Sequence, residues 1–280
     1  MKIQEIIDKI YAFHPSLGER EKETIDGLKI GDTSQECTGI ATGIYASVEV
    51  IEEAHAAGAN LLVVHEPVFY DHFDKEEAKS HNSIAKMKAE LCEKYGMVII
   101  RDHDHIHAHR PDGIYYGVMT ELGLQAYCKT DLMAPRDPEK FAFLFEFPDE
   151  GIPVKELAAQ WAKRLGLRNL RLCGNPDTMV KKMAWGGHCL YNSQGEIKKV
   201  DEADIDLYVP GECIDWEIAE YFKDARGLGL NKCMLLTGHF NKEELGMKHA
   251  VTWIARLVDY KLPVTWCPSH DMYWYLKELD

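Results

Sequence analysis

Four histidines are concentrated in one short segment, MVIIRDHDHIHAHRPDGI, at positions 103, 105, 107 and 109. The whole chain holds 13 histidines. A polar surface loop that is rich in histidine would account for this segment. A metal site would account for it equally well, because histidine is the commonest metal ligand among the side chains. If the segment is extended, alternate residues face the same way, so two of the four histidines can serve as ligands.

The other side chains that can bind a metal come directly after short apolar runs. His65 and Glu66 follow LLVV, and His103 follows MVII after two intervening residues. His239 and Glu243 follow CMLL in the same way. Such runs predict buried strands, and ligands bind open α/β sheets outside the carboxyl ends of the strands. The three segments are therefore candidates for one shared site.

Each candidate ligand also has a simpler role available. His65 and Glu66 can cap a strand and pair with a surface lysine, and His239 can form an ordinary hydrogen bond with Glu243 one helical turn away. As metal ligands, imidazole and carboxylate without cysteine favour Zn, Mn, Fe, Ni or Co. More than four candidate ligands come from distant segments, which suggests two ions, and these lie roughly 3.5–4 Å apart in such sites.

Alternating helical and strand patterns predict the elements that must position these residues, and they indicate an α/β fold. An apolar stripe at helical spacing predicts a first helix over 3–13 that presents Ile3, Ile6, Ile7, Ile10 and Phe13. Asn241 and Glu244 resemble a capping box at the start of a last helix. Strands are expected at 61–64, 97–100 and 233–236, and within the stretches FAFLFEF at 141–147, MAWGGHCL at 183–190 and DIDLYVPGE at 204–212. Two lobes, 1–130 and 131–280, are expected to meet at a hinge within 131–140.

The composition is that of an ordinary globular chain, with 46% hydrophobic and 28% charged residues among 280. The formal charge of −14 disfavours a nucleic-acid partner and would help to concentrate divalent cations. No apolar run reaches the roughly 18–20 residues of a membrane span. The eight cysteines form no C-x-x-C pair, and the N-terminus has no signal-peptide pattern, so we expect a cytoplasmic protein with free thiols.

Several motifs, in order, resemble the Nif-three-like dinuclear-metal family, whose members are often called GTP cyclohydrolase type 2 homologues. The early element DGLKIGD lies at 26–32. HEP at 65–67 stands where the family has HHP, and HDHIH at 103–107 stands where it has HTNLD. DG at 112–113, LGL at 122–124 and PGE at 210–212 follow, and GHFNKEELG at 238–246 matches the most specific motif. The length resembles that of compact members without a central inserted domain.

The resemblance implies a fold of two interlocked α/β lobes with mixed sheets, a metal cleft between them at strand ends, and a homohexamer. Carried over by position, the implied metal ligands are His65, Glu66, His103, His107, His239 and Glu243. Glu66 replaces a histidine of the family pattern, and His107 replaces an aspartate. Because the alignment of 103–107 can shift, Asp102, Asp104 and His105 remain alternative ligands.

The function expected from these features is that of a divalent-metal-dependent hydrolase with a dinuclear centre. Its substrate would be small and phosphorylated or heterocyclic, and Glu212 or His188 would move a proton in the reaction. The alternative is a non-enzymatic protein of the same family that handles metal or serves as a scaffold. Neither a nucleic-acid partner nor a membrane partner is expected.

Overall fold

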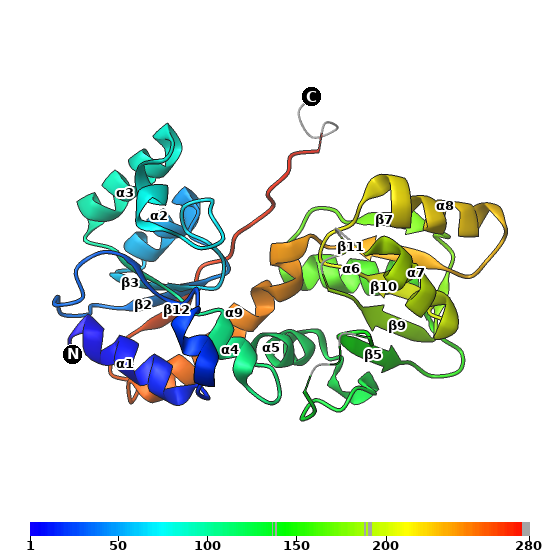
Figure 1. The fold of residues 1–280 in the computed structure, drawn as a ribbon, viewed down its shortest axis with the longest axis horizontal. Helices are drawn as coiled ribbons and strands as arrows, with labels where there is room; N and C mark the ends of the chain where they lie inside the picture. Colours follow the sequence, from blue (N-terminus) through cyan, green and yellow to red (C-terminus); the bar gives the residue numbers. More distant parts are fainter. Residues whose placement is uncertain (136, 138, 188, 190–191, 276–280) are drawn as a thin grey trace. The chain divides into compact units, whose positions relative to one another are not determined.

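A computed structural model describes residues 1–135, 137, 139–187, 189 and 192–275. Its internal contacts divide the chain into two compact units (Figure 1). The first unit comprises Met1–Val118 and Glu243–Met272, and the second comprises Met119–Lys242 and the chain from Tyr273. The chain passes between them three times, twice inside helices (at Val118/Met119 and Lys242/Glu243) and once near its C-terminus (at Met272/Tyr273). The lobes expected at 1–130 and 131–280 remain a prediction.

The described helices are short to medium in length. The α-helices are α1 (Ile3–Phe13), α2 (Val48–Ala56), α3 (Ser83–Tyr95), α4 (Asp104–Ala108), α5 (Gly113–Leu122), α6 (Val154–Leu165), α7 (Ser193–Glu202), α8 (Glu220–Gly227) and α9 (His239–Leu257). The 3₁₀ segments are η1 (Gly18–Lys22), η2 (Glu76–Ser80) and η3 (Gln125–Tyr127), and η4 (Asp215–Ala219) is a π-helix. None of the helices in the described ranges combines the length and apolarity needed to cross a bilayer.

The strands are also short. They are β1 (Gly27–Ile30), β2 (Ile40–Gly43), β3 (Leu61–Val64), β4 (Val98–Arg101), β5 (Phe143–Glu146), β6 (Ile152–Pro153), β7 (Arg171–Gly174), β8 (Met179–Val180), β9 (Lys182–Trp185), β10 (Leu207–Val209), β11 (Cys233–Leu236) and β12 (Val264–Trp266). The predicted strands at 61–64 and 233–236 are confirmed, and the one expected at 97–100 begins one residue later.

The first unit contains a five-stranded mixed sheet with the order β1-β4-β3-β2-β12. The four strands from β4 to β12 are parallel neighbours, and β1 pairs with β4 in the antiparallel sense. Every residue of β2, β3 and β4 is buried. Parallel strands are buried in this way when helices cover both faces. In Figure 1, α2 and α3 lie over one face of this sheet and α1 lies over the other.

The second unit contains another mixed five-stranded sheet, with the order β5-β9-β10-β11-β7. Its three central strands are parallel, and both edge strands are antiparallel to their neighbours. Helices α7 and α8 pack on one face, where Val200 and Phe222 join a core cluster with Tyr208 and Met234. The small β6–β8 ribbon lies outside this sheet. The predicted α/β class, with two mixed sheets, is confirmed.

Two local expectations are wrong for physical reasons. Helix α9 begins at His239, and the expected capping box does not form. The amide of Asn241 instead donates to the carbonyl oxygen of Thr237 (2.9 Å), and Glu244 accepts from the backbone N–H of Ser269 (2.5 Å). Phe13, expected on the buried stripe of α1, is 43% exposed. It is the last residue of the helix, and its ring stacks on Trp253.

Candidate metal centre

The residues after β3 are held in place by backbone hydrogen bonds. The backbone N–H groups of His65 and Glu66 both donate to the carbonyl oxygen of Ile44, at 3.1 and 2.8 Å. This connection turns the chain out of the sheet immediately after Val64. The His65 side chain is fully buried, and Glu66 is only 7% exposed. Both side chains therefore lie at the carboxyl end of a central parallel strand, as the sequence predicts.

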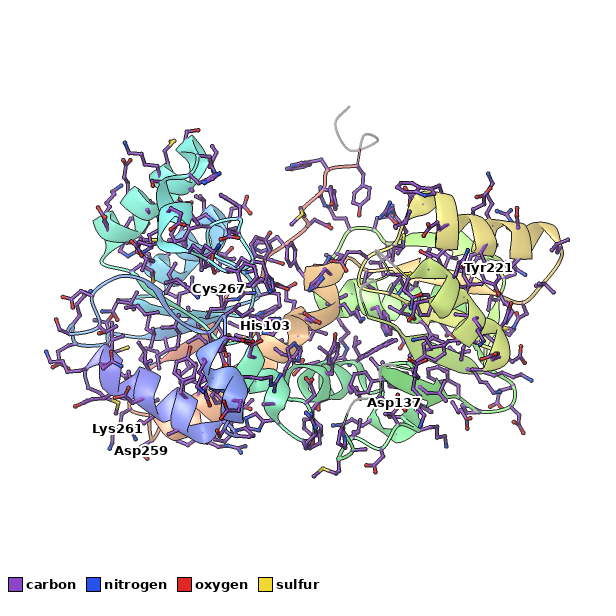
Figure 2. The ribbon with its side chains drawn as sticks, viewed as in Figure 1. His103, Asp137, Tyr221, Asp259, Lys261 and Cys267 are labelled. Carbon is purple, nitrogen blue, oxygen red and sulfur yellow. The ribbon has the colours of Figure 1, made fainter. Side chains whose placement is uncertain are left out.

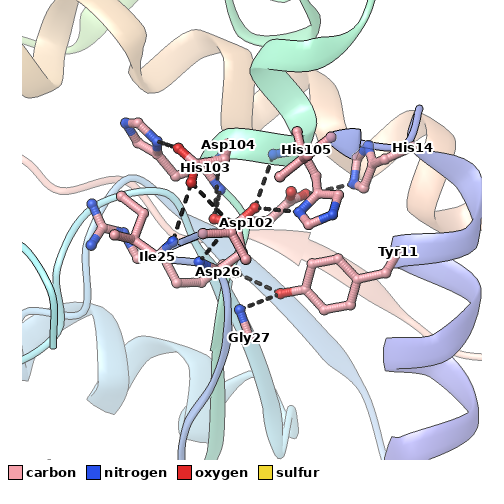
Figure 3. Close-up of polar contacts among 12 residues, drawn as sticks. Tyr11, His14, Ile25, Asp26, Gly27, Asp102, His103, Asp104 and His105 are labelled. Atoms are coloured by element: carbon pink, nitrogen blue, oxygen red, sulfur yellow. Dashed lines mark hydrogen bonds and ion pairs between the residues drawn. The ribbon is translucent and has the colours of Figure 1, made fainter. Parts of the chain in front are cut away.

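The histidine-rich segment after β4 forms the short helix α4 and is not extended. The carboxylate of Asp26 accepts hydrogen bonds from the backbone N–H groups of three successive residues, His103, Asp104 and His105, at 2.7–3.0 Å (Figure 3). It thereby satisfies N–H groups that the first turn of a helix leaves without partners. The alternation expected of an extended chain does not apply. Residues four apart share one face of a helix instead.

The helical conformation separates the four histidines by role. His103, labelled in Figure 2, and His107 are one turn apart, and the backbone N–H of His107 donates to the carbonyl oxygen of His103. His105 turns toward Asp26, and its Nδ1 lies 2.7 Å from Oδ2 of that residue. His109 contacts the ring of His14. Two of the four histidines thus reach the carboxyl ends of β3 and β4.

Each of the three gathered imidazoles has its Nδ1 bound to an oxygen acceptor. His65 donates to the backbone carbonyl of Asp102 (3.0 Å), His103 to Oδ1 of Asp104 (2.9 Å), and His107 to Oδ2 of Asp112 (2.9 Å). A carbonyl or carboxylate oxygen can only accept, so Nδ1 carries the proton in each ring. Nε2 is then the atom that each ring offers to a metal, as in metal sites whose histidines are oriented by an oxygen acceptor at the other nitrogen.

The acceptors are themselves fixed by further contacts. The hydrogen bond from His103 is the largest influence on Asp104 and lowers the pKa of that carboxyl group, and hydrogen bonds from Thr24 and the backbone N–H of Ile25 act in the same direction. Asp112 accepts from the backbone N–H groups of Ile114 and Tyr115 with its other oxygen. Both carboxyl groups are therefore held in place, and each orients a histidine.

Two groups of potential ligands emerge from the described part of the chain. We call the set of His65, His103 and His107 the nitrogen group, because all its ligand atoms are nitrogens. We call the set of His65, Glu66 and Glu243 the carboxylate group, because it contains both glutamates. Within each group the ligand atoms lie within 4.8 Å of one another. All of these residues belong to the first unit.

The buried Nε2 of His65 is placed where a metal ligand would be expected. It has no hydrogen-bond partner among the described residues, and it lies 3.5 Å from Oε2 of Glu243. Both atoms are electron-pair donors, because the ring proton is on Nδ1. A charged hydrogen bond between them would be about 2.7–2.9 Å long. Two ligands bound to one Zn²⁺ at about 2.1 Å in tetrahedral geometry lie roughly 3.4 Å apart. The observed distance fits a shared divalent ion.

Glu243 reaches this position because α5 and α9 approach closely within the first unit. A Cβ atom at Gly246 would lie 2.7 Å from the carbonyl oxygen of Ile114, and one at Gly117 would lie 2.7 Å from Cβ of His249. Only glycine permits this approach. It allows the Tyr115 hydroxyl to donate to Oε1 of Glu243 at 2.5 Å, which leaves Oε2 directed toward His65.

Arg101 supplies a buried positive charge beside the carboxylate group. Its side chain is fully buried, and its guanidinium donates to the backbone carbonyls of His65 (3.0 Å) and His72 (2.6 Å). A third nitrogen of the guanidinium lies 3.7 Å from Oε2 of Glu66, and Asp74 lies 3.8 Å away on another side. The guanidinium therefore offsets part of the negative charge of Glu66.

The remaining predicted site residues lie elsewhere. His239 and Glu212 belong to the second unit, where Nδ1 of His239 donates to Oε1 of Glu212 at 2.6 Å. This pairing repeats the pattern of the three histidines in the first unit. His188 lies outside the described residues. Of the alternative ligands, Oδ2 of Asp102 accepts from His14 (2.9 Å) and Nδ1 of His105 contacts Asp26, so each of these side chains has another partner (Figure 3).

Sequence reasoning missed the supporting residues of this site. Asp112 follows the histidines by a few residues, and its position before Gly113 at the start of α5 was the only available signal. Nothing in the local sequence marks Tyr115 or Arg101, because their partners are distant along the chain.

Comparison with known proteins gives consistent matches over nearly the whole chain. The family model described as Duf34/NIF3 (NGG1p interacting factor 3) matches residues 1–271. A Clostridium perfringens protein named "GTP cyclohydrolase 1 type 2 homolog" is 28% identical over 250 residues, 87% of each chain. A Yersinia pestis protein of the same name is 23% identical over 89% of this chain and 91% of the other.

Solved structures share the fold at lower identity. A Staphylococcus aureus hypothetical protein has a TM-score of 0.68 and 17% identity, with 99% of each chain covered. A Bacillus cereus protein related to NIF3 has a TM-score of 0.68 and 16% identity over the same shares. At this identity the likeness concerns the fold alone.

Proposed function

The chain belongs to the Duf34/NIF3 family, and from that premise we propose that it is a divalent-metal-dependent hydrolase with two ions per chain. The proposed ligands are His65, Glu66, His103 and His107, together with Glu243 and His239 on α9. The substrate would be small and either phosphorylated or heterocyclic. The names of the curated relatives point to the same class, since GTP is both phosphorylated and heterocyclic.

One observation carries this proposal. The lone pair on Nε2 of His65 faces a carboxylate oxygen at 3.5 Å, inside the protein and with no described donor between them. Leaving a buried polar atom without a partner costs roughly 1–3 kcal/mol. A divalent cation removes that cost and satisfies both atoms. The ligand types, imidazole and carboxylate, suit Zn, Mn, Fe, Ni or Co.

A divalent ion held by these residues would supply a water molecule with its pKa lowered from about 15.7 toward about 7. The side chains of this protein have separate tasks around it. Asp104 and Asp112 hold His103 and His107 in the tautomer that exposes Nε2. Tyr115 holds one oxygen of Glu243, and the other oxygen lies 3.5 Å from Nε2 of His65. The side chains of His103 and His107 are 25% and 20% exposed, so water and a small substrate can approach from their side.

His239 and Glu212 extend the proposal to the start of α9. His239 precedes Glu243 by one helical turn, and residues at this spacing share a face of the helix. Glu212 binds Nδ1 of His239 as Asp112 binds that of His107, so we assign it first to orienting that ring. Its role in proton transfer remains a prediction, as does that of His188. The homohexamer and the cytoplasmic location also remain predictions.

The experiment has two stages. The chain is purified without chelators and its metal content is measured by elemental analysis, beside a His65→Ala variant and a His81→Ala control at an exposed histidine. We expect close to two first-row ions per chain in the wild type and the control, and fewer in His65→Ala. The loaded protein is then screened against phosphoesters and cyclic amides, including GTP. Wild-type protein without bound metal, or His65→Ala with full metal content, would refute the metal assignment.

The alternative is a protein that stores or delivers metal, or uses it as a scaffold, without catalysis. The burial of the carboxylate group favours it, because His65, Glu66 and Glu243 are each at most 7% exposed. A closed site of this kind would hold its ions without exchangeable water. Water-proton relaxation of the Mn²⁺-loaded chain distinguishes the two cases. Fast-exchanging water supports the hydrolase, and its absence together with no turnover in the screen supports metal handling.

A further inference from the structure

The nitrogen group and the carboxylate group overlap at a single atom. Nδ1 of His65 donates to the carbonyl oxygen of Asp102, so only Nε2 is available for coordination. One nitrogen lone pair binds one ion. The two groups therefore cannot both be completed by His65. Among the ligands of the first unit, whichever ion takes this nitrogen, one position has only imidazoles and the other has both carboxylates.

Resting on the proposed function, we infer that the centre has two non-equivalent cation positions that select different metals. The position at His103 and His107 takes a borderline ion such as Zn²⁺. The position at Glu66 and Glu243 has a much weaker preference for Zn²⁺ and accepts a harder ion such as Mn²⁺.

The chemistry of the donor atoms supports this division. The Nδ1–H groups of His103 and His107 both donate to carboxylates, so the atom that each side chain offers to a metal is an imidazole nitrogen, Nε2. Imidazole suits Zn, Cu, Ni and Fe, whereas carboxylate suits Mn, Mg and Ca. The Zn²⁺-over-Mn²⁺ preference should therefore be large at the nitrogen position and smaller at the carboxylate position.

Arg101 also makes the two positions differ in their affinity for a cation. Its buried guanidinium lies 3.7 Å from Oε2 of Glu66 and repels a second cation bound to that carboxylate. The Nδ1 partners of His103 and His107 are both carboxylates, whose negative charge attracts a cation. The nitrogen position therefore fills first, and the carboxylate position fills second.

Two variants separate the positions. His107→Ala removes a nitrogen ligand, and Glu66→Gln keeps the shape of its side chain but removes the charge. His81→Ala and Glu90→Gln make the same chemical changes at exposed positions and serve as matched controls. Each full-length protein is stripped of metal, its fold is checked by circular dichroism, and Zn²⁺ and Mn²⁺ dissociation constants are measured by competition with a chelating dye.

We expect the two variants to affect different metals. His107→Ala should lose its tightest Zn²⁺ and keep its Mn²⁺ site, whereas Glu66→Gln should keep the tight Zn²⁺ and lose Mn²⁺. The ratio of Mn²⁺ to Zn²⁺ dissociation constants should be at least about tenfold larger in Glu66→Gln than in His107→Ala. Equal shifts for both metals in both variants would overturn the inference while leaving the proposed metal centre intact. Failure of the wild type to bind either metal would overturn both.

A titration of the wild-type chain tests the same inference without variants. Mn²⁺ is added from zero to two equivalents and followed by electron paramagnetic resonance. Non-equivalent positions predict an isolated Mn²⁺ signal up to one equivalent, and then a spin-coupled signal as the second position fills. A spin-coupled signal that grows in proportion to the added Mn²⁺ from the first addition would contradict the inference.

Discussion

Replacing Asp112 by asparagine changes one atom and should switch the tautomer of His107. In the native chain one oxygen of Asp112 accepts from the backbone N–H groups of Ile114 and Tyr115, both at 3.1 Å, and the other accepts from Nδ1 of His107 at 2.9 Å. The asparagine oxygen can take only one of these places. If it stays with the two N–H groups, the new NH₂ faces His107 and requires Nδ1 to accept. The ring proton then moves to Nε2, which can no longer bind a metal.

The expected loss of Zn²⁺ affinity follows from comparing the two possible orientations of the new amide. Turning the amide the other way would leave two buried N–H groups of α5 facing an NH₂ group, at about 1–3 kcal/mol each. The tautomer change is the cheaper response. Loss of a group that orients a metal-bound histidine costs about 10- to 100-fold in affinity, or about 1.4–2.8 kcal/mol. The cap of α5 is retained, so the metal-free protein should keep its stability to within about 1 kcal/mol.

The assay compares Zn²⁺ affinity and metal-free melting temperature in the wild type, Asp112→Asn and Asp32→Asn. Asp32 is an exposed residue that accepts a backbone hydrogen bond from Ser34, so it receives the same chemical change far from the site. We expect weaker Zn²⁺ binding in Asp112→Asn alone. If that variant binds Zn²⁺ within twofold of the wild type and melts normally without metal, the assignment of His107 as an oriented ligand is refuted.

Two further outcomes are expected. Tyr115→Phe removes the hydroxyl that holds Oε1 of Glu243. A Mn²⁺ titration should show about tenfold weaker Mn²⁺ binding at the carboxylate position. Urea denaturation should show a free energy of unfolding that is lower by about 1 kcal/mol. Burial lowers the pKa of Lys88 to about 8 in the folded chain, below its ordinary value of 10.5. The unfolded chain therefore binds more protons between these pH values. The contribution of Lys88 to the free energy of unfolding rises with pH across that window. Lys88→Met lacks this rise, so its urea midpoint should fall relative to that of the wild type between pH 8 and pH 10; a constant difference would contradict the buried charge.

The positions of the candidate ligands could be predicted because they depend on local patterns. Short apolar runs followed by polar residues mark the ends of buried strands, and this placed His65 and Glu66 after β3. The one-turn spacing of His239 and Glu243 needs only a helix. These inferences use neighbours in the chain, and they hold wherever secondary structure follows hydrophobic periodicity.

The orientation of the ligands could not be predicted, because it depends on distant partners. Helix α4 forms where an extended segment was considered, since Asp26 holds backbone N–H groups that lie 77–79 positions further along the chain. Tyr115 and Glu243 are separated by 128 positions, and Arg101 meets the carbonyl oxygen of His65 across 36. Such pairings arise from tertiary packing and leave no local pattern.

The central claim is that a cation joins His65 to Glu243, and anomalous X-ray diffraction tests it most directly. Crystals of the chain prepared without chelator would be measured on both sides of the absorption edge of the metal found by elemental analysis. The claim predicts an anomalous peak about 2.0–2.2 Å from both Nε2 of His65 and Oε2 of Glu243. It would be contradicted by a peak only at a remote site, or by a metal-free centre in which Nε2 of His65 is hydrogen-bonded to a donor.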